Sequence, residues 1–462
     1  MIPPAPTMAV LWAQYGPYHF ARAGALARLM APSKVHAIEL ASRTRDYEWD
    51  RAKTGLNLIT ICPDAVAERI PFFTVFFRTR RQFARLGIQA CFLPSYFPKQ
   101  SLAALLAAKS LGIRAIMMNE THAGTARASG LGAWGKRGLI GLFDAALVGG
   151  APQKRYFASI GLPEGKIFTG YDAVDNDHFA QRAKEVRGRA AELRTKHALP
   201  GHYFLSLGRF IAKKNLGALV RAYRQFLQAS QVKQTHLVLV GSGEEEGRLR
   251  ALCSELRLPI YDKTPVEIEK RKSKNEKEIA GVHFYGFRQI DENPLFYGLA
   301  DAFILPSIYE EWGLVVNEAM ASGLPVIVSQ TAGCAEDLLE MGQPVSTHAD
   351  EAESPRPNLP AQLNHLIRSN GFVFDPASSI ELSSIMLSLE SLPAMRGEMA
   401  RESSRIVEKF SCSNFAENAL EAAKVAMGRK PGPLRRDLDN EPVVATPMKD
   451  EAAKTSGVSP MR

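Results

Sequence analysis

The chain has 462 residues, which is too long for one ordinary hydrophobic core and fits two domains. Hydrophobic residues make up 46% and charged residues 23%, as in a soluble globular protein, and no apolar run reaches the roughly 18 residues of a membrane-spanning helix. The net charge of +9 fits a solvated basic surface, a face that contacts anionic lipid, or a site for an anionic donor. The sequence has no run of Lys and Arg interleaved with aromatic residues, which argues against binding of nucleic acid.

The cysteines and the N-terminal residues bear on the compartment. Residues 1–7 are rich in proline and lack the basic start and apolar core of a signal peptide. The five cysteines are scattered, with neither a CxxC pair nor a spacing typical of metal ligands, and such cysteines suit a reducing compartment. We therefore expect a cytoplasmic protein.

The first half of the chain alternates between short β-branched runs and helical patterns. Strands are expected at residues 8–14, 35–40, 57–61, 113–118 and 145–148, and helices at 20–30 and 102–110. This alternation is typical of a parallel sheet that helices cover on both faces.

Residues 71–78 form an unusual run, Pro-Phe-Phe-Thr-Val-Phe-Phe-Arg. On a helix this run is apolar nearly all round, which favours a helix buried in the core. The basic residues Arg78, Arg80 and Arg81 allow a second reading, in which the phenylalanines lie at a membrane surface beside anionic headgroups. Contact with the inner face of the cell membrane depends on this second reading.

A polar, charged stretch at residues 181–197 has no strong strand signal and is followed by Leu199-Pro200-Gly201, which indicates a domain junction. The alternation then restarts. Strands are expected at 202–207, 236–240, 282–285, 302–305 and 325–329, and helices at 216–227, 245–256 and 314–322. The pattern predicts two doubly wound α/β domains in tandem, at residues 1–190 and 191–394.

Four further segments differ from this pattern. Residues 263–278 are crowded with Lys and Glu and fit a solvated helix or a mobile loop, and residues 346–360 fit a long surface loop. Helices over 395–428 are expected to cross back to the first domain. Residues 429–462 are polar and rich in proline, so we expect them to be disordered.

The segment 306–321, Pro-Ser-Ile-Tyr-Glu-Glu-Trp-Gly-Leu-Val-Val-Asn-Glu-Ala-Met-Ala, is the most informative part of the chain. It follows an apolar strand, so it lies where open α/β sheets bind ligands. Gly313 permits close backbone approach, and the helix that begins there points free N–H groups outward, which suits a diphosphate. Glu310 and Glu318 are about 12 Å apart along a helix. This distance would allow one carboxylate to bind a hexose and the other a ribose, with the diphosphate between them. Alternatively, both residues are surface glutamates of an ordinary strand–loop–helix segment.

This segment resembles the Glu-x7-Glu signature of the family-four glycosyltransferases (glycosyl transferases group 1), retaining enzymes of the GT-B fold. Residues 322–329 and 333–337 are also similar to that family. The resemblance implies two Rossmann-like domains that face each other across a cleft, an acceptor-side first domain and a nucleotide-sugar-binding second domain. It implies a catalytic role for Glu310 and donor contacts by Glu311, Trp312, Gly313, Leu314 and Glu318.

A second element agrees with this assignment. Ser206-Leu207-Gly208-Arg209-Phe210 ends the first strand of the second domain, and Lys213-Lys214-Asn215 opens the next helix. The spacing is similar to the family's Gly-Arg…Lys element. Arg209 and Lys214 would converge on the donor phosphates and stabilise the departing nucleotide diphosphate, with Lys213 the weaker candidate of the lysine pair.

Other loops are assigned by the resemblance as well. Gly241 and Gly243 in one strand-end turn, and Phe287 after another, would line the nucleotide pocket. In the first domain Gly16 lies in the loop that faces the diphosphate, although Gly16-Pro17 replaces the family's double glycine. His122 corresponds to a histidine that contacts the donor sugar. His19 has two readings, a cleft residue or a structural histidine.

The implied reaction moves a sugar, with retention, from a nucleotide-diphosphate donor to a hydroxyl of a glycan or lipid-linked acceptor, in polysaccharide or glycolipid assembly. No Asp-x-Asp motif lies where the donor phosphates would bind, so Arg209, Lys214 and the helix start at Gly313 are expected to replace a divalent ion, with no cofactor. In front-face attack the leaving phosphate oxygen takes the acceptor's proton, and Glu310 orients the sugar. A nucleotide-sugar epimerase and a non-catalytic nucleotide-sugar-binding subunit stay as alternatives.

Overall fold

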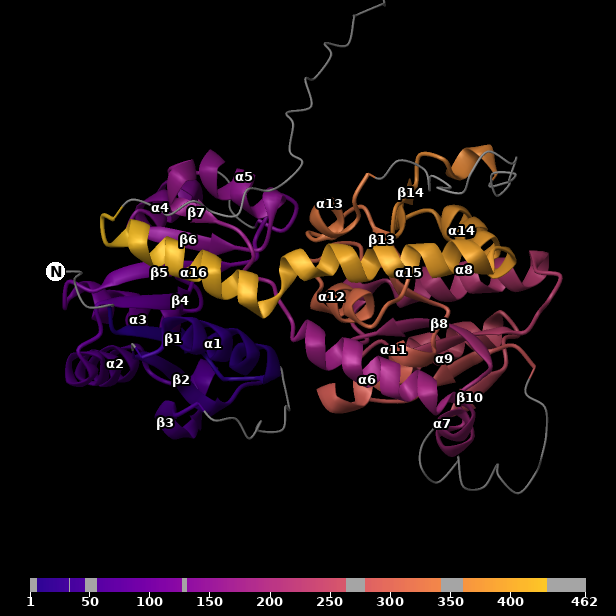
Figure 1. Ribbon diagram of the computed structural model, residues 1–462, viewed down its shortest axis with the longest axis horizontal. Coiled ribbons are helices and arrows are strands. Elements are labelled where there is room, and N and C mark those ends of the chain that lie inside the picture. Colours follow the sequence, from indigo (N-terminus) through magenta and orange to yellow (C-terminus); the bar gives the residue numbers. More distant parts are fainter. Residues whose placement is uncertain are drawn as a thin grey trace, which may run out of the picture.

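The computed structural model describes residues 6–32, 34–45, 56–126, 131–262, 279–341 and 360–429. Two α/β domains lie side by side along the long axis of the molecule (Figure 1). The expected insertion at 263–278, nearly all of the expected loop at 346–360 and the expected disordered tail beyond residue 429 lie outside the described residues.

The first domain is built on a seven-stranded sheet in which every pair of neighbours is parallel, in the order β3-β2-β1-β4-β5-β6-β7. Its elements are β1 (Met8–Trp12), α1 (Pro17–Met30), β2 (Val35–Arg43), β3 (Leu58–Val66), α2 (Phe72–Leu86), β4 (Ala90–Pro94), α3 (Lys99–Lys109), β5 (Arg114–Asn119), α4 (Leu131–Ile140), β6 (Ala145–Val148), α5 (Ala151–Ser159) and β7 (Ile167–Phe168). All five residues of β1 are buried, as expected of a central strand with helices on both faces.

The second domain contains an eight-stranded sheet in the order β10-β11-β9-β8-β12-β13-β15-β14, parallel except for the pair β14–β15. Its strands are β8 (His202–Leu207), β9 (Thr235–Val240), β10 (Ile260–Asp262), β11 (Val282–Phe284), β12 (Ala302–Leu305), β13 (Val326–Ser329), β14 (Ile367–Arg368) and β15 (Gly371–Phe374). Its helices are α6 (Asn176–Gly188), α7 (Ala190–His197), α8 (Leu216–Ala229), α9 (Glu246–Glu255), α11 (Asn293–Leu299), α12 (Leu314–Ala321), α13 (Ala335–Leu338), α14 (Ser379–Ser391) and α15 (Pro393–Val407). The prediction of two doubly wound α/β domains is confirmed.

Strand order reverses at one point in each sheet. In the first sheet, β1 lies between β2 and β4, and in the second, β8 lies between β9 and β12. The loops that leave the two strands at such a point go to opposite faces of the sheet and open a crevice at its carboxyl edge. The loops after β8 and β12, which carry most of the predicted donor residues, flank this point in the second domain.

The last helices join the two domains. In α15, Met395 and Met399 are buried in the second domain's core. The final helix, α16 (Cys412–Ala426), buries Phe415 and a stripe of alanines against β1, β4 and β5 of the first domain. Figure 1 shows this segment, in yellow, running across both domains. Among the described helices none has both the length and the apolar character required to cross a bilayer.

Helix α2 differs from the expected helix that is buried all round. Val75, Thr79 and Phe83 face the core, whereas Phe73 and Phe77 are 70% and 63% exposed. Because these two lie four residues apart, they share one face of the helix and their rings stack at 6.5 Å. The helix is therefore amphipathic, with two large aromatic side chains on its outer face.

Candidate donor and acceptor site

Glycines join the loops at the carboxyl edge of the second sheet. The amide of Gly208 donates to Val240 O at 2.9 Å, and that of Gly241 donates to Gly286 O at 2.9 Å. Gly208, Gly241 and Gly243 have φ of 148°, 138° and 156°, which only glycine adopts without strain. A Cβ on Gly241 would lie 1.9 Å from Gly208 O. The strand exits of β8, β9 and β11 thus form one closely packed backbone surface.

Two lysines and a carboxylate meet beside this surface. Lys213 and Lys214 lie in a 3-10 turn, and the Nζ of Lys213 is 3.1 Å from Oε1 of Glu310 and 2.5 Å from Oε2 of Glu311. Lys214 bonds the other oxygen of Glu310, to which Ser307 also donates at 3.2 Å. The loops after β8 and β12 therefore place Lys213, Lys214 and Glu310 together. Lys213, the weaker candidate of the lysine pair in the sequence analysis, contacts both Glu310 and Glu311.

The charge state of Glu310 follows from these neighbours. The residue is only 8% exposed. Burial alone would raise its pKa, but the ammonium groups of Lys214 and Lys213 hold the pKa below the ordinary value. Burial would lower the pKa of Lys213, but Glu310 and Glu311 raise it. Glu310 is consequently an anion with two cations beside it, which suits a sugar bonded to a diphosphate.

Gly313 begins helix α12 in the left-handed region, at φ 111°. Glu311 and Leu314 on either side are partly exposed. Trp312 has no exposed surface: its ring packs in the second domain's core and its Nε1 donates to Asn317 at 2.9 Å. The structure thus places the indole of Trp312 behind the loop, where it supports the turn at Gly313, and not on the surface that a donor reaches.

Glu318 faces the first domain. It is fully buried and accepts hydrogen bonds from the hydroxyl of Tyr18 and, at 3.4 Å, from Nδ2 of Asn293. Burial raises its pKa to about 7, although hydrogen bonds from Tyr18, Tyr297 and Asn293 act in the opposite direction. The hydroxyl of Tyr18 therefore bonds the same carboxylate that the sequence analysis considered as a ligand of the donor ribose. Tyr18 and Asn293 were not predicted.

The first-domain residues His122 and Gly16 both form hydrogen bonds to other residues of the protein. His122 Nε2 donates to Glu310 O at 2.9 Å, and its Nδ1 accepts from Gly124 N at 3.2 Å. The Gly16 amide donates to Nδ1 of His19 at 2.9 Å. Burial, and then the charge of Arg22, lower the pKa of His19 to about 3, so His19 is a neutral structural residue that caps α1.

Further polar contacts cross between the domains near the start of α5. Gln153 Nε2 donates to Glu311 O at 2.9 Å, and the Ala151 amide lies 3.1 Å from both carboxylate oxygens of Asp337. Arg155 bonds Glu336 through both terminal nitrogens. Nothing local in the sequence marks these pairs, because the partners are more than 150 residues apart and meet only where the two folded domains contact each other.

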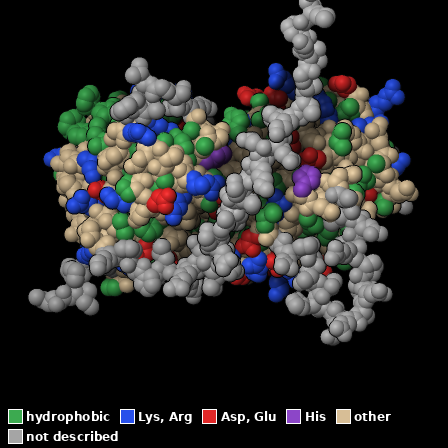
Figure 2. All heavy atoms as spheres, turned by 90° about the horizontal axis from the view of Figure 1, so that it is seen from above, with side chains coloured by type: hydrophobic (Ala, Val, Ile, Leu, Met, Phe, Trp, Pro, Cys, Tyr) green, Lys and Arg blue, Asp and Glu red, His purple; other side chains and the backbone are tan. Residues whose placement is uncertain are grey.

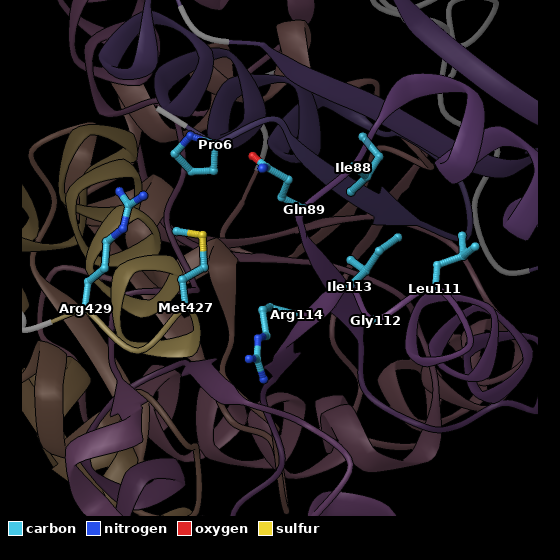
Figure 3. A pocket seen from close by; sticks show the side chains of 9 residues that line it. All are labelled: Pro6, Ile88, Gln89, Leu111, Gly112, Ile113, Arg114, Met427 and Arg429. Atoms are coloured by element: carbon cyan, nitrogen blue, oxygen red, sulfur yellow. The ribbon is translucent and has the colours of Figure 1, made fainter. Parts of the chain in front are cut away.

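The remaining predicted residues lie at the same edge with exposed side chains. Arg209 follows β8 and is exposed, and Phe287, after β11, is 45% exposed. Figure 3 shows a hollow lined by Gln89, Arg114 and Arg429, at the amino ends of β4 and β5. That hollow is on the opposite edge of the first sheet and takes no part in the site. Among the described residues, no group of three or more His, Cys, Asp or Glu is placed to hold a metal ion.

Residues 191–405 match the family model described as Glycosyl transferases group 1. An uncharacterised glycosyltransferase of Methanocaldococcus jannaschii is 33% identical over 132 residues, which are 29% of this chain and 28% of that protein. The chain thus matches 28% of the length of that protein, and also 28% of the length of mannosylfructose-phosphate synthase of Agrobacterium fabrum.

Two solved structures share the arrangement of both domains. HepE of Anabaena, in complex with UDP, has a TM-score of 0.59 at 15% identity, with 89% of this chain and 98% of that chain covered. Sucrose-phosphate synthase from Thermosynechococcus elongatus has a TM-score of 0.60 at 17% identity, with 89% and 96% covered. At these identities the likeness establishes the fold, and the expected GT-B fold is confirmed.

Proposed function

We propose that this protein is a metal-independent hexosyltransferase that acts with retention, because residues 191–405 match the family model described as Glycosyl transferases group 1. The donor is a nucleotide-diphosphate sugar, and the acceptor is a hydroxyl of a glycan or glycolipid under assembly. The observation that carries the proposal is the cluster of Glu310 with Lys213 and Lys214 at the strand-order reversal of the second sheet.

The cluster suits the charge changes of this reaction. When the bond between the sugar and the diphosphate breaks, negative charge grows on the leaving phosphate oxygen. Lys213 and Lys214, with Arg209 on the same loop, offer cationic donors for that charge, as do the free amides at the start of α12. Glu310, held as an anion, accepts hydrogen bonds from sugar hydroxyls and orients the sugar.

Retention would follow from attack on the same face that the phosphate leaves. The acceptor oxygen forms the bond to the anomeric carbon while the leaving phosphate oxygen takes the acceptor's proton. Glu310 is assigned to orientation and not to a covalent intermediate, because both of its oxygens already bond lysine ammonium groups. Because Lys213, Lys214 and Arg209 would neutralise the phosphates without a divalent ion, we expect activity to survive an excess of EDTA. Activity that disappears with EDTA and returns with magnesium or manganese would contradict this part.

The exposed aromatic face of α2 supports contact of the first domain with a membrane at the cytoplasmic side, where a lipid-linked acceptor would lie.

Two other functions stay as alternatives. A nucleotide-sugar epimerase would release an altered sugar nucleotide without any acceptor, and a non-catalytic subunit would bind the donor without turnover.

The deciding experiment is a donor screen. Purified protein is melted with uridine, guanosine and adenosine diphosphate sugars, because a ligand that binds only the folded state raises the melting temperature. Uridine diphosphate sugars come first, since HepE of Anabaena is described in complex with UDP. The donor with the largest shift is then incubated with octyl glycosides, and products are followed by mass spectrometry. No shift with any donor would reject the proposal.

A further inference from the structure

Tyr18 of the first domain reaches across the domain boundary to the second domain. It is the second residue of α1, and its ring packs against the second domain's hydrophobic core. Its hydroxyl donates a hydrogen bond to Oε1 of Glu318, on α12. Tyr18 is partly exposed, whereas Glu318 has no exposed surface. Tyr18 therefore covers one oxygen of a carboxylate that solvent does not reach.

The other oxygen of Glu318 lies beside an amide whose hydrogen bonds are incomplete. Asn293, at the start of α11, is 3% exposed, and its Nδ2 is 3.4 Å from Oε2 of Glu318. The Oδ1 of Asn293 is buried and accepts no hydrogen bond from a described residue. Such a carbonyl oxygen costs free energy until a donor reaches it. The groups that bond Glu318 are hydroxyls and an amide, all uncharged, which suits a ligand with hydroxyl groups.

Glu318 lies on the helix whose start faces the candidate phosphate site. α12 begins after Gly313, and Glu318 is on this helix, about 7 Å along the axis from Gly313. A diphosphate bound to the free amides at the helix start would bring an attached ribose toward Glu318. Two vicinal ribose hydroxyls need both carboxylate oxygens as acceptors, and one of these is the oxygen that Tyr18 bonds. Tyr18 and the ribose therefore cannot both be bonded there.

We propose that Tyr18 competes with the donor's ribose for Glu318 and so weakens nucleotide binding. The inference rests on the proposed function, with Glu318 as the ribose ligand. Because Tyr18 is partly exposed, its side chain can leave toward the domain boundary, whereas Glu318 stays in place on α12. The apparent Kd of the nucleotide is then the intrinsic Kd divided by the fraction of molecules in which the bond is open. Return of Tyr18 to Glu318 after sugar transfer would displace the nucleoside diphosphate.

The test removes the Tyr18 hydroxyl and keeps its ring. Calorimetric titration compares wild type, Tyr18→Phe and a control, Tyr156→Phe, whose hydroxyl bonds Lys136 within the first domain. The ligands are UDP, GDP or ADP, whichever matches the donor found in the screen, and the dideoxyribose analogue of the same nucleotide, which lacks both ribose hydroxyls. We expect Tyr18→Phe to bind the ribose form roughly 3- to 10-fold more tightly than wild type, as release of one hydrogen bond predicts, and the analogue within about twofold of wild type. Tyr156→Phe should bind both ligands like wild type.

A gain of affinity separates competition from a merely structural role, because partial loss of structure would weaken binding. Unchanged or weaker binding of the ribose form by Tyr18→Phe, or an equal gain for both ligands, would overturn the inference. In either case wild type would still bind the nucleotide and transfer sugar from the donor, so the proposed function would stand. If wild type bound none of the nucleotides, the proposed function would fail and the inference with it.

Discussion

At the residue scale, lysine and glutamate side chains that follow two strands of the second sheet meet and form the centre of the candidate site. Lys214 and Glu310 are 96 residues apart, yet each follows a strand that borders the strand-order reversal. Their residue types and strand-end positions allowed both to be predicted. The pairing of Tyr18 with Glu318 spans 300 residues and two domains, so no local pattern marks it.

We expect Arg209→Ala and Lys214→Ala each to lower kcat/KM for the donor without unfolding the protein. Loss of a cation that stabilises the leaving diphosphate should cost about 2 to 4 kcal/mol of transition-state stabilisation, or roughly 30- to 1000-fold in rate. Arg248→Ala, at a largely exposed arginine on α9, serves as the control. Steady-state kinetics that match wild type for both variants would remove these residues from the phosphate site.

Replacement of Glu318 by Gln should change how stability depends on pH. Burial raises the pKa of Glu318 from 4.5 to about 7, so the protonated group favours the folded state at low pH. This contribution is lost as the pH rises through about 7, and the loss amounts to about 3 kcal/mol. Gln does not ionise, so the melting temperature of Glu318→Gln relative to wild type should rise between pH 5 and pH 8. A pH-independent difference, like that expected for the exposed control Glu255→Gln, would contradict the burial of this charge.

At the element scale, most strands were predictable and several connections were not. Residues 8–13 and 302–305 are uninterrupted apolar runs, and residues 202–207 are apolar except for His202 and Ser206, as is typical of buried parallel strands. β4, Ala-Cys-Phe-Leu-Pro, has no β-branched residue and was missed. The junction expected at 181–197 lies in helices α6 and α7, and α7 buries no residue, so it has no apolar stripe that reveals a helix.

The backbone surface that joins β8 and β9 gives a stability prediction. Gly241→Ala places a Cβ within 1.9 Å of Gly208 O at φ 138°. Strain and overpacking together should destabilise the protein by about 3 kcal/mol. Gly247→Ala, in α9 with no atom within 4 Å of its Cβ, should instead stabilise by about 0.5 to 1 kcal/mol. Urea unfolding of both variants measures the two effects, and equal midpoints would show that this turn tolerates a side chain.

At the scale of the whole molecule, the two domains differ in what they hold. The second domain carries most of the candidate site residues on one sheet edge, and the first contributes Tyr18, His122 and Gln153, which hydrogen-bond to them across the domain boundary. The resemblance to known sequences was stronger in the second domain, and the family match covers residues 191–405. Donors share a diphosphate whereas acceptors vary, so the acceptor side offers less sequence pattern to recognise.

The outer face of α2 gives the last prediction. Phe73 and Phe77 are exposed there, and Phe97, before α3, is 78% exposed. Gln100 near the start of α3 bonds the carbonyls of Glu68 and Ile70, which holds the starts of α2 and α3 together. Figure 2 shows hydrophobic side chains gathered at the outer end of the first domain.

Charge on α2 complements these aromatic side chains. The helix contains four arginines and no acidic residue, and Arg80, Arg81 and Arg85 are exposed. Each cation should add about 1 kcal/mol of attraction to anionic lipid. We therefore expect reversible, salt-sensitive binding to phosphatidylglycerol vesicles and little binding to phosphatidylcholine. In co-sedimentation, Phe73→Ser/Phe77→Ser and Arg80→Ser/Arg81→Ser should each pellet less than wild type. Arg221→Ser/Arg248→Ser, which removes two exposed arginines of the second domain, should pellet like wild type. Equal pelleting of all four proteins at low salt would show that the basic surface as a whole, and not α2, attracts the vesicles.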